Sequence, residues 1–297
     1  MIYTRTIGDV RLTNLVEYFA PTHDPVALYP DFDPSVIDLN RSWLSNAHWY
    51  ENLQRLVVAI QIWIVHVDDK VILVDTGVGN FKPRAAARMN MLNSLVPQWL
   101  AAADASFEQV THVVMTHLHG DHVGWNTVPG SEGWVPAFPN AQYFIPRRDF
   151  DYFKALHETN PAADPSFGDS VLPVVAAGLA RFVEPGDVVA GCLTAESAAG
   201  HTPGQMNYWL RRKDEQAVFC ADLFHHPLQI TNPDLNTAFC VLPETARETR
   251  LAFLERVADT GTLILPCHFG PPHCGYVNRT DNGFAFQPSE PDLPQFN

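Results

Sequence analysis

The strongest constraint on the fold is one short run of side chains of the kinds that bind metal ions. Four of them fall within six consecutive positions, in the sequence His-Leu-His-Gly-Asp-His that ends at His122. Imidazole nitrogens and a carboxylate oxygen at this density indicate a divalent transition metal. The preceding residues 110–115 are mostly apolar and β-branched, which predicts a buried strand. Gly120 permits a sharp turn after that strand. The chain must therefore fold so that a strand-to-loop corner carries the metal site.

Four ligands in one tight loop serve two ions better than one, so further ligands are expected elsewhere in the chain. Three candidates follow in order: His201 in AGHTPGQ, Asp222 in FCADLFHH and His268 in LPCHFG. Each comes after a strand-like apolar run or a turn signal. Upstream, Asp75 ends the run VILVD, where it is either part of the site or a plain turn residue.

In these segments the chain resembles the metallo-β-lactamase superfamily, whose five motifs match in order between roughly residues 57 and 270. The resemblance implies an α/β fold, a four-layer αββα sandwich with the metals in a groove at one edge of the sheets. Asp75 is implied to orient a ligand imidazole through its free N–H. The implied ligands are His117, His119 and His201 for one metal, Asp121, His122 and His268 for the other, and Asp222 as the bridge.

The same resemblance implies a dinuclear metal hydrolase close to the lactonase and organophosphate-hydrolase group. We expect two divalent ions, with zinc as the expected metal and manganese, cobalt or iron(II) as alternatives. A hydroxide bridging the metals would be the nucleophile, because a bound metal brings the pKa of water to about 7. Asp121 and Asp222 would be catalytic in fixing it. The favoured reaction opens a lactone or cleaves a related carboxylic ester.

Other branches of the superfamily fit less well. Glyoxalase-II-like thioesterases usually carry basic residues near the C-terminus, where this chain has only Arg279 after His268. Flavodiiron proteins usually have Glu at the position of His119, and zinc β-lactamases usually have Cys or Ser at that of Asp222. A phosphotriester hydrolase and a mononuclear iron dioxygenase of the persulfide-oxidising kind stay open. A non-catalytic metal-binding protein is disfavoured because all seven ligand positions are filled.

The proton donor for the leaving group is a separate question. Acyl-homoserine lactonases carry a tyrosine three residues after the bridging aspartate, whereas this chain has His225 there. Histidine can donate a proton near neutral pH. His225 is therefore a candidate catalytic residue, with a structural role as the alternative, and the departure weakens the case for acyl-homoserine lactones.

Composition narrows the partners. The net charge is -14 with only 19 Lys and Arg, which argues against nucleic acid. We expect a neutral or apolar small-molecule substrate and leave a homodimer open. The N-terminus shows no secretory signal and no apolar run is long enough to span a membrane, so a cytoplasmic protein is expected. Five cysteines without a CxxC pair argue against a disulfide framework.

We expect one domain over residues 1–297, with two segments outside its core pattern. Residues 20–52 are predicted to be a substrate-loop insertion. Residues 125–139 follow the His-Leu-His-Gly-Asp-His run at residues 117–122, which we call the box. The hypothesis is an apolar, aromatic-walled pocket over the metals that includes Trp43 and Trp49. Alternatively, these aromatics pin the loops to the body or build a dimer contact. The proline-containing tail 287–297 is expected to be an extended strap or a disordered end. Strands are expected near residues 9–18, 57–67, 70–75, 110–116, 141–145, 181–184, 192–197, 206–211, 216–221 and 262–266, and helices near 87–103, 148–157 and 243–258.

Overall fold

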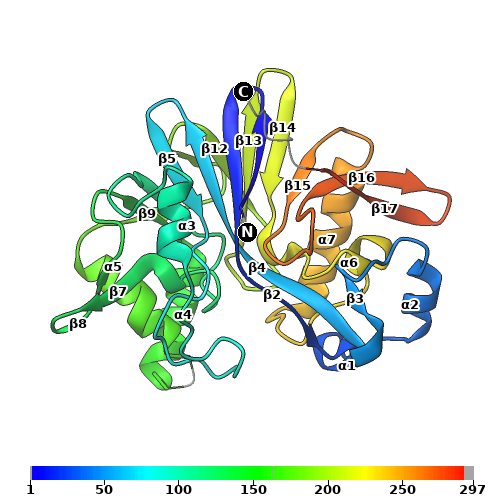
Figure 1. Cartoon of the computed structure of the whole chain (residues 1–297), viewed down its shortest axis with the longest axis horizontal. Coiled ribbons are helices and arrows are strands. Elements are labelled where there is room, and N and C mark those ends of the chain that lie inside the picture. The colour runs from blue at the N-terminus through cyan, green and yellow to red at the C-terminus, as the bar shows by residue number, and fades with distance from the viewer. Residues whose placement is uncertain (1, 163, 291–297) are drawn as a thin grey trace.

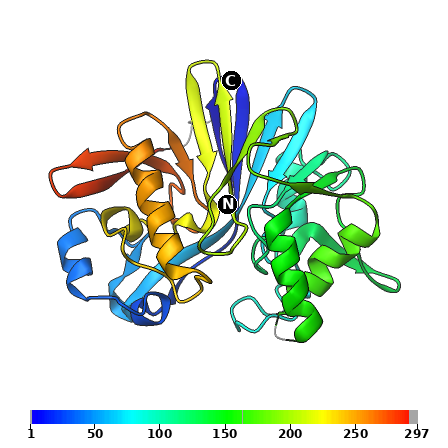
Figure 2. The same ribbon diagram turned by 180° about the vertical axis from the view of Figure 1, so that it is seen from behind.

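Two mixed β-sheets pack face to face at the centre of the molecule, and helices cover their outer faces (Figures 1 and 2). The structure is a computed structural model that describes residues 2–162 and 164–290, so residues 291–297 of the expected tail lie outside it. The eight-stranded sheet has the order β1-β2-β4-β5-β6-β9-β10, with β3 paired to β4. Its strands are β1 (Ile2–Ile7), β2 (Val10–His23), β3 (Trp49–Tyr50), β4 (Arg55–Val67), β5 (Lys70–Val74), β6 (His112–Val114), β9 (Gln142–Pro146) and β10 (Ala180–Val183).

The seven-stranded sheet runs in sequence order from β11 to β17. Its strands are β11 (Val188–Val189), β12 (Leu193–Ser197), β13 (Met206–Arg212), β14 (Glu215–Phe219), β15 (Leu263–Leu265), β16 (Gly275–Thr280) and β17 (Gly283–Pro288). A separate hairpin joins β7 (Thr127–Gly130) to β8 (Gly133–Pro136). The helices are α1 (Pro25–Leu28), α2 (Ser35–Asn40), α3 (Val96–Ala102), α4 (Arg147–Thr159), α5 (Leu172–Ala176), α6 (Leu228–Thr231) and α7 (Pro243–Val257).

Three apolar layers hold this arrangement together, one between the sheets and one under each group of helices. Trp63 of β4 meets Phe219 of β14 edge to face between the sheets. Outside the first sheet, α3, α4 and α5 pack against strand residues such as Ile64. Outside the second sheet, Phe253 of α7 packs near Val218. This layering is the predicted αββα sandwich, and it arises because each sheet buries both of its faces.

Several predicted elements differ from the observed ones. The helix expected over residues 87–103 is only α3, because residues 81–92 instead form a compact loop with a hydrogen bond of 2.8 Å from the Phe81 N–H to the Leu92 carbonyl. The strand expected at 262–266 is observed as β15, and the β16–β17 hairpin that follows it was not predicted. β1 was not predicted. In each case long-range pairing or anchoring overrides the local pattern.

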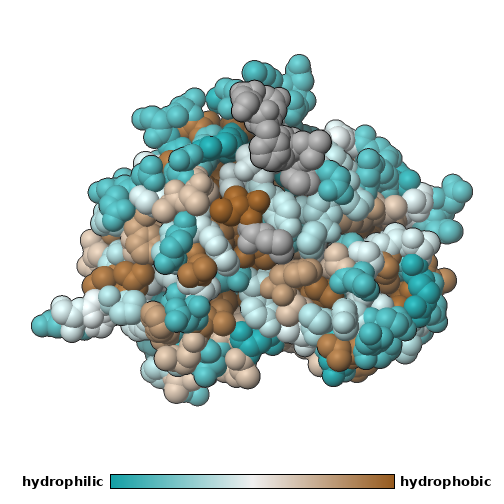
Figure 3. All heavy atoms as spheres, in the orientation of Figure 1, coloured by the Kyte–Doolittle hydropathy of each residue, from teal (hydrophilic) through white to brown (hydrophobic). Residues whose placement is uncertain are grey.

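The segment over residues 20–52 begins inside β2 and continues through α1, α2 and β3. Its aromatic and aliphatic residues, Tyr29 among them, form a small core together with Leu56, Leu228 and Leu235 from other segments. Over the described part of the chain, every helix is too short or too polar to cross a lipid bilayer. On the face shown in Figure 3, polar and apolar side chains alternate in small patches.

Candidate metal centre

The predicted ligand segments all follow strands whose carboxyl ends meet at one edge of the sandwich. β5 leads to Asp75 and its parallel neighbour β6 leads to the box at residues 117–122. In the other sheet β14 leads to Asp222 and its parallel neighbour β15 leads to His268. His201 lies in the connection between β12 and β13. Carboxyl ends of parallel strands lie at the same edge of a sheet, so the topology itself brings these segments together.

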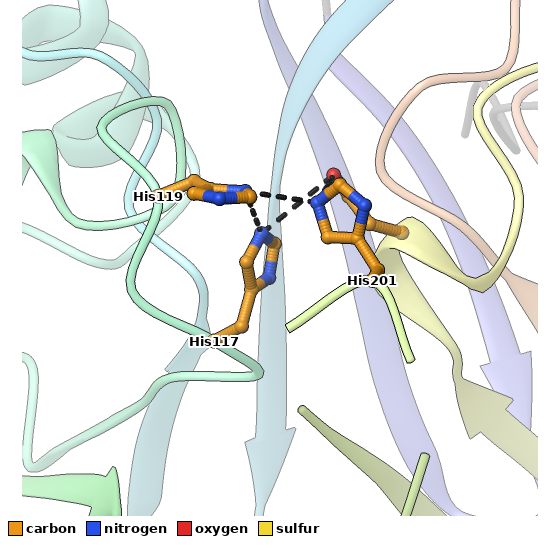
Figure 4. A group of neighbouring side chains, drawn as sticks. His117, His119 and His201 are labelled. Atoms are coloured by element: carbon orange, nitrogen blue, oxygen red, sulfur yellow. Dashed lines mark hydrogen bonds and ion pairs between the residues drawn. The ribbon is translucent and has the colours of Figure 1, made fainter. Parts of the chain in front are cut away.

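Three histidines and one carboxylate form the first group at this edge (Figure 4). The His119 Nδ1 atom lies 3.0 Å from the His117 Nε2 atom and 2.8 Å from the His201 Nε2 atom. The Asp222 Oδ2 atom lies 3.6 Å from the His117 Nε2 and 3.1 Å from the His201 Nε2. Four potential ligand atoms from three separate segments thus converge on one point.

The second group uses the other oxygen of Asp222. Its Oδ1 atom lies 3.2 Å from the His122 Nε2 and 3.0 Å from the His268 Nε2. Asp121 borders the same nitrogens, with a carboxylate oxygen 3.8 Å from each. Asp222 therefore stands between two groups of histidines and presents one oxygen to each.

These residues fit a pair of divalent ions. The His122 Nε2 and the Asp222 Oδ1 are buried, yet neither has a hydrogen-bond partner among the described residues. Ligand atoms around a tetrahedral zinc, with bonds of about 2.0–2.1 Å, lie about 3.3 Å apart. This value falls within the distances between facing atoms in the first group, from 2.8 to 3.6 Å, and in the second, from 3.0 to 3.8 Å. Buried polar atoms without partners are rare and need an explanation. Both atoms belong to the second group, and a metal ion bound there would satisfy them.

Neighbouring groups orient most of the ligand imidazoles through their second nitrogen. The His122 Nδ1–H donates to the Asp75 Oδ2 over 2.9 Å, as the resemblance implied. Asp75 is itself fixed by the Thr116 N–H at 2.8 Å and by the Thr116 hydroxyl at 2.7 Å. The His268 Nδ1–H donates to the Ala59 carbonyl at 2.7 Å. Such partners fix the ring orientation and tautomer of a metal-binding histidine.

A buried carboxylate holds the connection that carries His201. The Thr202 hydroxyl donates to the Asp149 Oδ2 at 2.8 Å and the Gly204 N–H donates to the Asp149 Oδ1 at 2.5 Å. Burial raises the pKa of Asp149 to about 6. The Nδ1 atom of His201 has Cys240 as its neighbour, with the Sγ atom 3.8 Å away.

Burial and charge set the protonation of the cluster. Burial lowers the pKa of His117 well below its ordinary value and that of His119 to about 3, which leaves both rings neutral. Burial alone would raise the pKa of Asp222, but the surrounding histidines lower it well below its ordinary value. Burial alone would lower the pKa of His201, but Asp222 raises it to about 9. Burial would also lower the pKa of His122 and of His268, but nearby carboxylates, Asp222 first among them, raise the pKa of His122 well above its ordinary value and raise that of His268. Metal binding would therefore meet an ionised Asp222 and neutral rings at His117 and His119, and would displace the protons held on His122 and His201.

His225 lies beside the ligands, as its sequence position suggested. Its Nε2 atom is 3.1 Å from the Asp222 Oδ2, and its ring stacks on that of His268 with centroids 5.1 Å apart. Burial lowers the pKa of His225 to about 4. Its ring is therefore neutral at pH 7 and carries a single N–H.

A cavity of about 370 Å³ opens onto both ligand groups. Much of its wall is apolar, and it includes Val58, Ile60 and Phe239. Trp43 and Trp49 are absent from this wall, which contradicts the expected aromatic pocket: Trp49 is buried in the small core of the 20–52 segment and Trp43 packs against that core. The segment 125–139 also contributes nothing to the wall, since most of it forms the β7–β8 hairpin.

Several wall residues were missed in the sequence. Tyr18 and His23 come from β2, each just after a shift in its register with β4. Arg84 and Arg88 come from the loop over residues 81–92. Strand bulges leave no clear trace in a single sequence. Three basic residues within seven positions of a chain poor in basic residues, starting at Lys82, were a usable signal for the loop.

The protein is an αββα sandwich with two groups of histidine and aspartate side chains at one sheet edge. These two features define its class. A sequence model of the Metallo-beta-lactamase superfamily matches residues 55–268, and the chain belongs to this superfamily. A search among curated proteins found no match.

Solved structures of similar fold cover nearly the whole chain. The hydrolase AbOPH of the beta-lactamase superfamily is 25% identical, with a TM-score of 0.82 over 98% of both chains. AidC, a dizinc quorum-quenching lactonase, is 21% identical, with a TM-score of 0.78 over 97% of both chains. A probable metal-dependent hydrolase from Staphylococcus aureus is 16% identical, with a TM-score of 0.72 over 96% of this chain and 99% of the other.

Proposed function

We propose that this protein is a dinuclear metallohydrolase that opens a lactone or cleaves a related carboxylic ester. The observation that carries the proposal is Asp222, whose two oxygens face two separate groups of ligands. One group would be His117, His119 and His201, and the other Asp121, His122 and His268. The completeness of the second group favours two ions over the single iron of a dioxygenase. Zinc is the first candidate, with manganese, cobalt and iron(II) as alternatives.

Two divalent ions at this site would supply Lewis acidity toward a carbonyl oxygen and lower the pKa of bound water. The residues of the chain would do the rest. Asp121 and Asp222 reduce the net charge of the site, and Asp75 and Ala59 hold two ligand rings in place. His225, whose ring lines the cavity beside Asp222, would hydrogen-bond the substrate or the leaving group. The apolar wall suits an acyl chain or a lactone ring.

We favour lactones and related esters over phosphotriesters because one solved structure of similar fold is that of a lactonase. AidC is a lactonase, and its fold matches over nearly the whole chain. A phosphotriester is the second candidate, since the same site chemistry reaches phosphorus as well as carbon.

The test is proton release by metal-replete protein against lactones, aryl esters, a phosphotriester and a β-lactam, with Asp222→Asn as the blank. We expect turnover of lactones and esters. Asp222→Asn should lower kcat by at least about a hundredfold and should also lower the amount of bound metal. Mutating even a residue that only hydrogen-bonds a metal ligand typically costs about 10–100-fold in metal affinity or activity. Exposed Asp234→Asn is the matched control. Full activity and full metal content in Asp222→Asn would refute the bridging role.

If the protein binds two metals and turns over no substrate of the panel, the hydrolase proposal is refuted. Oxygen consumption that requires iron(II) and a persulfide would then identify a dioxygenase.

A further inference from the structure

One guanidinium in the wall of the cavity has no partner among the residues that the structure describes. Arg88 is half-buried and lines the same cavity as His119, Asp121 and His268. It makes neither a hydrogen bond nor an ion pair with any other described side chain. A cation in an apolar cavity wall that lacks a counter-ion is ready to bind an anion.

The loop that carries Arg88 is closed at its base and anchored in the body of the protein. The Met91 N–H donates to the Lys82 carbonyl at 2.8 Å. The Arg84 guanidinium donates twice to the buried Asp169 carboxylate, at 2.7 and 3.0 Å, and the Lys82 Nζ lies 3.2 Å from the same carboxylate. The fold therefore fixes where the tip of this loop lies.

The other charged groups of the cavity wall are already engaged. Arg84 is paired with Asp169. Asp121 and Asp222 belong to the ligand groups. The Asp164 carboxylate accepts hydrogen bonds from the Ser166 N–H and the Ser166 hydroxyl. Within the described wall, Arg88 is thus the cation left for a ligand.

Arg88 shares the cavity with His23 and with residues of both ligand groups. Burial lowers the pKa of His23 to about 3, and the charges of Arg88, His268 and His225 add to this effect. His23, Arg88 and His268 line the same cavity, and the charges of Arg88 and His268 both reach His23. A substrate held at the metal centre can extend toward Arg88.

We propose that Arg88 binds an anionic group of the substrate, so that the cavity selects esters or lactones that carry a carboxylate remote from the bond cleaved. This inference rests on the proposed hydrolase function and replaces the neutral or apolar substrate expected from the sequence with an anionic one. A net charge of -14 repels anions in general, so a dedicated cation is needed to admit one. The apolar part of the cavity wall, which includes Val58 and Ile60, would accommodate a short methylene chain.

The test compares two aryl esters of similar length, mono-4-nitrophenyl glutarate and neutral 4-nitrophenyl pentanoate. Arg88→Gln should lower kcat/KM for the glutarate ester about tenfold to a hundredfold, mainly through KM, as expected for the loss of a charge-assisted hydrogen bond. The pentanoate ester should be little affected. Arg88→Lys should restore part of the loss. Arg181→Gln removes an exposed arginine on β10 and is the matched control.

A second measurement is independent of turnover. Glutarate should bind to the metal-free wild-type protein in calorimetry, and at least about tenfold more weakly to Arg88→Gln. If Arg88→Gln handles both esters as the wild type does, the inference is wrong while the hydrolase proposal stands. If neither ester is cleaved but glutarate binding depends on Arg88, the anion site stands and ester hydrolysis fails. If glutarate binds neither protein, the anion site is refuted.

Discussion

Single atoms decide the chemistry of this site. Asp222 gives one oxygen to each ligand group, and His119 reaches its group through Nδ1 where His117 and His201 use Nε2. The second nitrogens are handled differently from ring to ring, by Asp75 for His122 and by a backbone carbonyl for His268. Removing the hydrogen-bond partner of one ligand ring should therefore change the orientation of that ring and leave the other ligands in place.

Asp149 is buried and accepts hydrogen bonds from the connection that carries His201. Its pKa is about 6 in the folded protein against 3.8 for the free side chain. Between these values the folded state holds a proton that the unfolded state has lost, so this contribution to stability is present below about pH 4 and is lost as the pH rises through 6. Asp149→Asn should remove the effect.

The measurement is urea unfolding of metal-free wild type and Asp149→Asn from pH 4 to pH 7. The free energy of unfolding of the wild type should fall relative to the variant by about 1–3 kcal/mol over this range. A difference that does not change with pH would show that Asp149 is ionised throughout.

At the scale of elements, irregular strands and anchored loops shape the cavity. The first shift of register in β2 puts Tyr18 opposite Ile60 and leaves Glu17 without a paired residue on β4. The Glu17 carboxylate then accepts from the Val78 N–H at 2.6 Å and from the Trp125 indole N–H at 2.7 Å. One bulge thus supplies a cavity side chain and a buried anchor for two loops.

The loop over residues 81–92 depends on Asp169 in the π-helical turn Phe167–Val171. Asp169→Ala would leave the buried cations of Lys82 and Arg84 without their carboxylate. We expect the free energy of unfolding to fall by about 3–5 kcal/mol, as for other buried pairs that lose one partner. The measurement is chemical unfolding at pH 7.

The control for Asp169→Ala is Asp9→Ala, which breaks the exposed pair with Arg212. It should change stability very little, because solvent screens exposed pairs. Equal losses in the two variants would contradict the anchoring role of Asp169.

For the whole molecule, the site is a junction between the two sheets. β4 of the first sheet holds the segment that carries His268: the Trp63 indole N–H donates to the Pro266 carbonyl at 3.1 Å and the Gln61 amide to the Phe269 carbonyl at 2.7 Å. The box follows the first sheet, whereas Asp222 and His268 follow the second. A metal ion would therefore link both halves of the sandwich.

Metal removal should for this reason lower the stability of the whole fold. With free zinc at about a thousand times its dissociation constant, binding adds about 4 kcal/mol to the free energy of unfolding. We expect a chelator to lower the Tm of the wild type clearly and that of Asp222→Asn much less. Calorimetry with and without the chelator measures both. Identical melting of chelated and metal-replete wild type would contradict the link.

The sequence by itself determined the candidate ligands and the layered fold. Its ligand box is contiguous, each remaining ligand candidate lies a few residues beyond a strand, and parallel strands bring their ends together whatever the loops do. Only the tertiary structure decided what surrounds the site. Trp43 and Trp49 pack in a separate small core and not in the cavity wall. Arg88 lines the cavity because its loop is anchored by Asp169, some eighty residues away. Contacts between distant segments set the path of a loop, and no local pattern of residues encodes them.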